Sequence, residues 1–199
     1  MEKNLNKILH NMTKDKITLS RIKLMHPNLR KEVEGMYQLF TQALTGKAIC
    51  RFAYTLRSFK EQNDLFALGR TVANPNGKTT KRPFGSIVTN ARGGQSYHNF
   101  GLAFDIVLLK DTEGTGKFNK ASWETNVDFD GDGKPDWQEI VTIAKQHGWE
   151  WGGDWKFTDM PHFQRTFGLS VVELSGLVQN GKVYPGTTYP IIEGKPMLV

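Results

Sequence analysis

The stretch "SYHNFGLAFDIVLL", residues 96–109, sets the fold of the chain around it. Its second half is apolar enough to predict a strand that is buried on at least one face. Because strand side chains alternate between the two faces, four residues share one face of this strand: Ala103, Asp105, Val107 and Leu109. Asp105 therefore stands in an otherwise apolar row, where an ionised carboxylate is costly unless it is paired or bound to a metal. His98 lies just before the strand, in the loop that leads into it.

A second stretch, "DWKFTDMPHFQ", residues 154–164, offers partners for these two residues. His162 opens a predicted short strand, and Asp159 lies three residues before it. Two histidines and one carboxylate are a common ligand set for catalytic zinc, so His98, Asp105 and His162 are candidate ligands. Asp159 is then a nearby carboxylate that could accept a proton from water. Spacing alone leaves the alternative open, because a histidine in a strand is often a core residue and an aspartate before a strand often forms a turn.

The stretch "DFDGDGKPDWQE", residues 128–139, resembles the calcium-binding loop of an EF-hand. The expected ligands are five acidic side chains and one backbone carbonyl: Asp128, Asp130, Asp132, Asp136 and Glu139, with the carbonyl of Lys134. An ordinary Asp-Gly turn is the alternative. There is no second copy, and Pro135 lacks the N–H that pairs two such loops, which disfavours a calcium sensor. We expect calcium to order this segment, to shape the wall of the zinc site and to modulate activity.

Outside these stretches, the apolar pattern predicts helices and strands in irregular alternation. Helices are expected over 27–46, 57–69, 137–148 and 170–183, strands over 48–56, 101–109 and 161–167, a long loop over 70–95, and a connection with a short helix over 110–127. Without a regular βαβ rhythm, the α+β class is favoured, with a small antiparallel sheet flanked by helices. We expect one domain over 1–199, with its core at about 20–175, the acidic loop at 128–139 and a tail at 176–199.

Composition limits the possible classes of protein. The chain has 199 residues with 38% hydrophobic and 23% charged residues, so it can bury a core, and no apolar run predicts stable membrane insertion. The start, residues 1–16, is too polar for a signal peptide, so we expect synthesis in the cytoplasm. The single cysteine, Cys50, excludes an internal disulfide.

The charge is distributed unevenly. The formal net charge is +6, although the window 128–139 alone holds five acids and one lysine. A basic surface favours an anionic partner such as nucleic acid, phospholipid or an anionic cell-envelope polymer. No nucleic-acid-binding motif is present, so we expect no nucleic-acid partner.

The two histidine stretches together resemble a known family. "SYHNFGLAFD" matches Ser-x-His-x-x-Gly-x-Ala-x-Asp, and "DMPHF" supplies acid-x-x-His. This pairing is similar to that of the zinc peptidases that cut peptidoglycan stem peptides, which include D-alanyl-D-alanine metallopeptidases and the L-alanyl-D-glutamate endopeptidases found as phage endolysins. The resemblance covers roughly residues 20–175 and implies the Hedgehog/DD-peptidase fold.

The resemblance also implies roles for individual residues. His98, Asp105 and His162 would bind zinc, with Asp159 as the general base. Arg57 aligns with the family arginine that holds the substrate and stabilises charge on the scissile carbonyl. Ser96, two residues before His98, would contact the substrate or orient the loop.

One departure points to a branch of this family. The D-alanyl-D-alanine enzymes have glutamate where this chain has Asp159, and "GSIVTNARGGQSYH", residues 85–98, also looks like the L-alanyl-D-glutamate branch. We therefore expect a monomeric, endolysin-like enzyme that acts on peptidoglycan stem peptides after release by phage lysis. The alternatives are a D-alanyl-D-alanine carboxypeptidase or dipeptidase, and a non-catalytic cell-wall-binding module.

Overall fold

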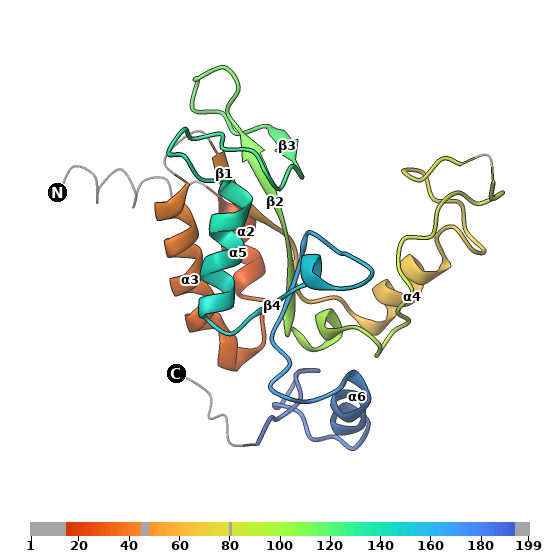
Figure 1. The fold of residues 1–199 in the computed structure, drawn as a ribbon. Coiled ribbons are helices and arrows are strands. Elements are labelled where there is room, and N and C mark those ends of the chain that lie inside the picture. Colours follow the sequence, from red (N-terminus) through yellow and green to blue (C-terminus); the bar gives the residue numbers. More distant parts are fainter. Residues whose placement is uncertain (1–14, 45–47, 80, 194–199) are drawn as a thin grey trace.

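The computed structural model describes residues 15–44, 48–79 and 81–193. The expected helix end at Gly46, nearly all of the polar N-terminal stretch and the end of the predicted tail lie outside these residues. The described chain combines helices with one small antiparallel sheet (Figure 1), as the sequence predicts. None of the helices in these ranges is long and apolar enough to cross a membrane.

The sheet has five strands arranged around the central strand β2. The strands are β1 (Ala48–Tyr54), β2 (Ala103–Lys110), β3 (Lys120–Ser122), β4 (Glu150–Trp151) and β5 (His162–Gln164). Their order is β1-β2-β5-β4, and β3 pairs with the far end of β2. Strand β5 pairs with the first residues of β2, and β3 pairs with the last. The two ends of β2 therefore have different neighbouring strands.

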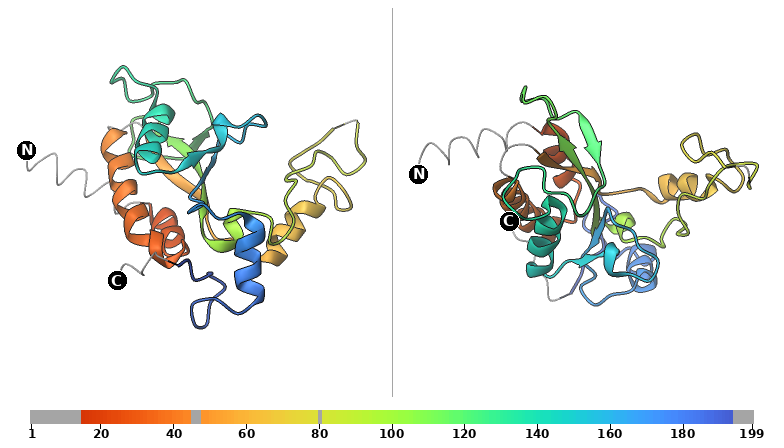
Figure 2. Two further views of the ribbon diagram at one scale, coloured as in Figure 1. Left: turned by 60° about the horizontal axis from the view of Figure 1, so that its bottom comes forward. Right: turned by 45° about the horizontal axis from the view of Figure 1, so that its top comes forward.

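Three helices cover one face of this sheet (Figures 1 and 2). They are α2 (Lys16–Ile22), α3 (Arg30–Ala43) and α5 (Asp136–Gln146). The other two helices, α4 (Phe59–Ala67) and α6 (Val171–Gln179), lie outside this layer. Short 3₁₀ helices complete the chain: η1 (Pro27–Leu29), η2 (Tyr97–Phe100) and η3 (Gly152–Asp154).

A row of aromatic rings holds the helices to the sheet. Phe52, Phe104 and Phe163 lie on adjacent strands, with ring centroids 4.5 Å and 5.2 Å apart, and all three are fully buried. Each buried ring stabilises the fold by roughly 2 kcal/mol. Because strand side chains alternate, burial of Phe104 and Phe163 toward the helices turns the next residues, Asp105 and His162, to the opposite face.

The local predictions agree with the structure except in short elements. The capping box of Ser58 and Glu61 at the start of α4 is confirmed, and α5 begins one residue before the predicted start. The short helix expected within 110–127 is wrong, because this segment instead forms β3 on the edge of β2. Strands of two or three residues, such as β3 and β4, are too short to give a periodic pattern.

Candidate active site

Three side chains from two strands and a 3₁₀ helix converge on the sheet face opposite the helices. His98 comes from η2, Asp105 from β2 and His162 from β5, and Asp105 and His162 are direct cross-strand partners. The Oδ1 atom of Asp105 lies 3.1 Å from Nε2 of His98 and 3.2 Å from Nδ1 of His162. These two ring nitrogens are themselves 3.2 Å apart. The sequence-predicted triad is therefore brought together in space.

The hydrogen bond on the far side of His98 fixes its protonation pattern. Its Nδ1 lies 2.7 Å from the carbonyl oxygen of Thr55, and a carbonyl can only accept, so Nδ1 carries the hydrogen. In the neutral ring, Nε2 then presents a lone pair to the centre of the site.

His162 is held in the complementary way by a chain of two polar residues. The amide nitrogen of Gln164 donates to Glu150 at 2.8 Å, which leaves the Gln164 oxygen to accept from Nε2 of His162 at 3.1 Å. In the neutral ring, Nδ1 of His162 therefore presents its lone pair to the same centre. Gln164 was not among the residues predicted for the site, although alternation places it on the same strand face as His162.

This arrangement fits a divalent metal ion. Two imidazole lone pairs and a carboxylate oxygen meet within 3.2 Å, and three acceptors repel one another unless a cation lies between them. Tetrahedral zinc with bonds of about 2.0–2.2 Å spaces its ligand atoms roughly 3.3–3.5 Å apart. His98 and His162 are buried, and Asp105 is the third member of the group, so the donor set matches that of catalytic zinc.

The charges within the triad are strongly coupled even without the metal. Burial opposes ionisation of Asp105, but the His98 and His162 imidazoles hold the pKa of that carboxyl well below its usual range. Burial likewise lowers the pKa of His162, yet the hydrogen bond and charge of Asp105 raise it overall. Asp105 is therefore a stable negative charge that favours a cation at this centre.

Asp159 lies in the same turn as His162. Its N–H donates to the carbonyl of Gly152 at 2.9 Å, and its own carbonyl accepts from the N–H of His162 at 3.1 Å. A Cβ atom at residue 152 would lie 2.5 Å from the Asp159 carbonyl and 3.2 Å from the Cβ of His162, so only glycine allows this close approach. Partial desolvation and the Asp105 carboxylate raise the pKa of Asp159, although the residue remains exposed to solvent.

Arg57 is buried beside the triad and braced from two sides. One guanidinium nitrogen, Nη1, donates to Oε1 of Gln62 at 2.8 Å, while Nη2 lies 3.6 Å from Oδ2 of Asp105. The guanidinium also lies over the ring of Tyr54, 4.9 Å from its centroid. Gln62 in turn donates to the carbonyl of Ala91, which ties the arginine to the loop before η2. The Nε atom of Arg57 is buried and has no hydrogen-bond partner.

Ser96 begins η2 as its N-cap. Its hydroxyl accepts from the N–H of His98 at 3.4 Å, so the hydroxyl helps to orient the loop. Asn99, which the sequence analysis missed, completes this capping box and donates to the carbonyl of Arg57 at 2.9 Å. The Ser-x-x-Asn spacing was the available signal for it.

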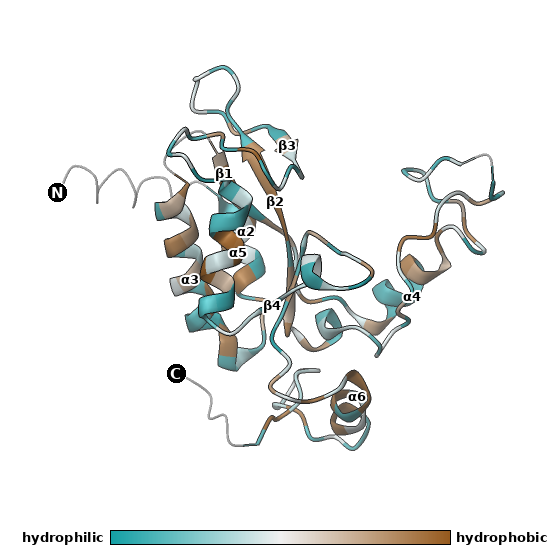
Figure 3. Cartoon of the chain, in the orientation of Figure 1, coloured by the Kyte–Doolittle hydropathy of each residue, from teal (hydrophilic) through white to brown (hydrophobic). Residues whose placement is uncertain are grey.

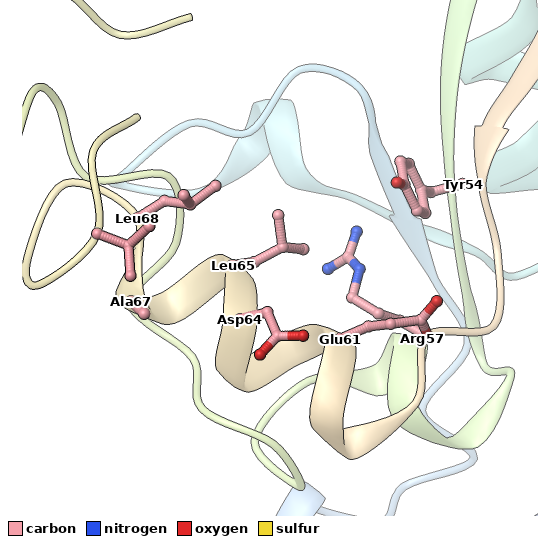
Figure 4. A pocket seen from close by; sticks show the side chains of 8 residues that line it. Tyr54, Arg57, Glu61, Asp64, Leu65, Ala67 and Leu68 are labelled. Carbon is pink, nitrogen blue, oxygen red and sulfur yellow. The ribbon is translucent and has the colours of Figure 1, made fainter. Parts of the chain in front are cut away.

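A groove of about 880 Å³ runs over these residues. All six predicted zinc-site residues line it: Arg57, Ser96, His98, Asp105, Asp159 and His162. Trp155 and Phe157 add an apolar wall, and Phe157 is 85% exposed. A smaller hollow of about 420 Å³ shares Tyr54, Arg57 and Leu65 with the groove, and the Arg57 guanidinium reaches between the other two side chains (Figure 4).

The acidic loop forms a second, separate cluster at the other end of β2. Two overlapping groups of carboxylates could each hold a cation: Asp128, Asp130 and Asp136, and Asp130, Asp132 and Glu139. No residue of 128–139 lines the groove. At this end of β2, the ammonium of Lys110 lies 3.8 Å from the ring centroid of Phe129. Lys110 lies five positions along β2 from Asp105, about 17 Å away. The expectation that this loop walls the zinc site is therefore wrong.

Within this loop, one acid is buried and incompletely satisfied. Asp136 is fully buried at the start of α5, where its Oδ1 accepts from the N–H of Phe129 and its Oδ2 has no partner. The Oε2 atom of Glu139 is also buried without a partner. The ammonium of Lys134 lies 3.7 Å from both Asp132 and Glu139 and partly neutralises the cluster.

Comparisons with known proteins find similarity over the segment that contains this site. Residues 89–165, which contain the triad and Asp159, match a family described as D-alanyl-D-alanine carboxypeptidase. The chain is 48% identical over 109 residues to the peptidoglycan L-alanyl-D-glutamate endopeptidase CwlK of Bacillus subtilis. That match covers 54% of this chain and 55% of the relative, so the chain spans about half the length of that relative.

A solved structure is also similar. The Serratia marcescens L-Ala D-Glu endopeptidase ChiX matches 76% of this chain and 88% of its own, with 23% identity and a TM-score of 0.45. The sequence matches therefore show similarity to a D-alanyl-D-alanine carboxypeptidase family over residues 89–165 and to a peptidoglycan endopeptidase over 109 residues.

Proposed function

We propose that this chain is a zinc-dependent peptidoglycan endopeptidase that hydrolyses the L-alanyl-D-glutamate bond of stem peptides. The observation that carries the proposal is the convergence of His98, Asp105 and His162 within 3.2 Å, at the floor of a groove that also holds Asp159 and Arg57. The identity to a relative named for this activity supports the choice of bond.

In this proposal, His98, Asp105 and His162 hold the zinc ion. Bound zinc supplies Lewis acidity, which brings the pKa of water to about 7 and polarises a carbonyl. Asp159 accepts a proton from the attacking water and delivers it to the amine nitrogen as the peptide C–N bond breaks. Its raised pKa suits this exchange, because a base works best when its pKa approaches the working pH.

Arg57 stabilises the negative charge that develops on the scissile carbonyl oxygen. Its guanidinium is held by Gln62 and by the ring of Tyr54, so little motion is needed when the charge forms. The guanidinium lines the groove, where Nη2, which lies 3.6 Å from Asp105, can donate to a substrate oxygen. Ser96, which also lines the groove, contacts the substrate in this proposal.

The second candidate is a D-alanyl-D-alanine carboxypeptidase, which the description of the matching family favours. The two activities give different products, so mass spectrometry of digested peptidoglycan fragments separates them. We expect new L-alanine carboxyl ends and D-glutamate amino ends, and none with Asp159→Ala. Release of free D-alanine instead would support the carboxypeptidase, and binding without any product would support a wall-binding module.

The finer parts of this proposal concern the setting of the enzyme. We expect a monomeric endolysin that reaches the wall through phage lysis and has no nucleic-acid partner. This setting would be supported if the enzyme cleaves the wall of host cells when it is added to the medium but not while it is inside intact cells. Size-exclusion chromatography should give the mass of one chain. Activity confined to the producing cell during normal growth would contradict it.

We also propose that the acidic loop binds calcium. The buried, unpartnered oxygens of Asp136 and Glu139 support this, because a buried carboxylate without a partner is costly unless a cation reaches it. The EF-hand spacing supplies enough oxygen ligands for a calcium ion. Calorimetric titration of the metal-free protein with calcium tests this, and no heat at millimolar calcium would refute it.

The effect of calcium binding would be transmitted to the active site through α5 and not through the wall of the groove. Asp136 begins α5, and the chain leaves this helix directly into β4, where Glu150 accepts from Gln164. Ordering the start of α5 would therefore steady the strand that orients His162. This coupling predicts a higher zinc affinity with calcium than without it.

A further inference from the structure

The positive charge of the chain is concentrated in the loop after α4. Residues 70–92, which we call the basic arm, contain no acid and five cations: Arg70, Lys78, Lys81, Arg82 and Arg92. The formal net charge of the whole chain is +6, so this short segment carries most of the excess. No acid occurs between Asp64 and Asp105.

The basic arm is a folded loop with its own hydrogen bonds. The N–H of Asn74 donates to the carbonyl of Phe84 at 2.8 Å, and the N–H of Ser86 donates to the carbonyl of Gly77 at 2.7 Å. Gly85 has a φ of +84°, and a Cβ there would lie 2.3 Å from the Gly77 carbonyl oxygen, so glycine is needed where the two limbs meet. These bonds close the base of the arm and present residues 78–79 and 81–84 at its tip.

The cations at this tip are exposed and unneutralised. Lys78, Lys81 and Arg82 are exposed, and no acid of the described chain pairs with them. Arg70, in contrast, is used to build the arm, because its guanidinium donates to the carbonyls of Phe66 and Thr89. The tip therefore presents positive charge that the fold itself does not use.

The arm also connects this charge to the groove. Its second limb, Val88 to Ala91, lines one side of the groove. Its tip projects away from the sheet and helices (Figures 1 and 2) and is hydrophilic along most of its length (Figure 3). A long polymer held at the tip would thus lie beside the groove without blocking it.

We propose that the tip of the basic arm binds the phosphodiester backbone of an anionic polymer attached to the cell wall. Repeated phosphates match the three exposed cations Lys78, Lys81 and Arg82, and guanidinium groups bind phosphate with two hydrogen bonds. Only one large apolar side chain, Phe84, is exposed at the tip, which disfavours membrane insertion. The inference rests on the proposed function for the location at the wall, and it is independent of the catalytic residues.

The test compares binding and catalysis in the full-length, zinc-loaded protein. The variant K78Q/K81Q/R82Q is compared with K16Q/K23Q/K31Q, which removes the same charge from exposed lysines on and beside α2 and α3. A third variant, K78R/K81R/R82K, keeps the charge of the tip. Each is sedimented with walls that carry a polyol-phosphate polymer and with the same walls after acid extraction of that polymer.

We expect K78Q/K81Q/R82Q to bind untreated walls roughly tenfold more weakly, since each exposed ion pair contributes a modest factor and three act together. The other two variants should bind like the wild type, and extraction should abolish the difference among them. Equal losses in the two neutralised variants, or a loss in K78Q/K81Q/R82Q that persists on extracted walls, would overturn the proposal. Stronger binding to DNA or to vesicles of anionic lipid than to soluble poly(glycerol phosphate) would also overturn it.

Cleavage of a soluble stem-peptide fragment is measured in parallel. K78Q/K81Q/R82Q should cleave this fragment at the wild-type rate, because the fragment carries no phosphodiester polymer. Loss of wall binding with normal cleavage supports the arm. Absence of cleavage in the wild type refutes the proposed function and leaves the binding comparison intact.

Discussion

The two candidate metal centres lie at opposite ends of β2 and are built in different ways. At the first end, each imidazole is held by a partner outside the centre, Thr55 for His98 and Gln164 for His162. At the second end, the acids are held mostly by backbone N–H groups of their own loop, such as Gly131 and Gly133 on Asp128.

This difference indicates how each centre responds to its ion. The triad is oriented by strands and by buried partners, so its geometry is set before the metal arrives. The acidic loop depends on local turns, and it leaves oxygens of Asp136 and Glu139 without partners. We therefore expect metal at the triad to supply chemistry and metal at the loop to supply stability.

The largest expected effect is at the triad end. Asp159→Ala should lower the hydrolysis rate by about 10²–10⁴, because the proton transfer loses its base. Asp159→Glu should also lower it, since one extra methylene moves the carboxylate relative to the attacking water. Rates on purified stem peptides measure both.

The control for Asp159 is Asp154→Ala in the same connection. Asp154 pairs with Lys145 and does not line the groove, so its loss should leave the rate nearly unchanged. An Asp159→Ala variant that keeps the wild-type rate would remove Asp159 from the mechanism.

The next effect concerns how firmly the triad is preset. Gln164→Leu removes the acceptor that holds Nε2–H of His162, and zinc affinity should fall about 10- to 100-fold. Competition with a chromophoric chelator measures the affinity, and nitrogen NMR of His162 reports which ring nitrogen carries the hydrogen in the metal-free protein.

Glu150→Gln is the matched variant for this test, because a glutamine oxygen still accepts from the Gln164 amide. It should change the zinc affinity less than Gln164→Leu does. If Gln164→Leu leaves both the affinity and the His162 protonation pattern unchanged, the triad is not preset by this chain of residues.

The sequence predicted the triad because its signal is local. Alternation places Asp105 on a strand face with only apolar neighbours, and His98 and His162 flank two strands that an antiparallel sheet can join. Arg57 followed from the family resemblance alone, whereas Asp159 was already a candidate from its position three residues before His162. The brace between Arg57 and Gln62 had no signal, because it depends on how α4 leaves β1.

The acidic loop shows the opposite limit of sequence reasoning. Its spacing predicted a cluster of carboxylates, and the residues do cluster. Its distance from the groove could not be predicted, because that distance depends on β3 pairing with the far end of β2. A strand of three residues gives no periodic signal from which that pairing could be inferred.

At the loop end, the expected effect is on stability. Calcium at about 100 times its dissociation constant should stabilise the fold by roughly 2.7 kcal/mol, which raises Tm by several degrees. Asp136→Asn should remove most of this rise. Asp111→Asn is the control, since Asp111 also accepts from backbone N–H groups but lies in a different loop.

Thermal unfolding with and without calcium measures this effect, with the zinc concentration held fixed. A rise in Tm that survives in Asp136→Asn would place the calcium elsewhere. A fall in hydrolysis rate on calcium removal, with Tm unchanged, would contradict the assignment of stability to the loop.

The smallest expected effect is a pH dependence of Tm that comes from the acidic loop in calcium-free protein. Burial, with Asp130 and Asp128 nearby, raises the pKa of Asp136 to about 6. A carboxyl whose pKa is raised on folding contributes stability that is present below its unfolded pKa, about 4, and is lost as pH rises through 6. The Tm of the wild type minus that of Asp136→Asn should therefore fall between pH 4 and pH 7. Calcium should reverse this trend, because the ion binds the ionised carboxylate. A Tm difference that does not change with pH in calcium-free protein would show that ionisation of Asp136 does not destabilise the fold.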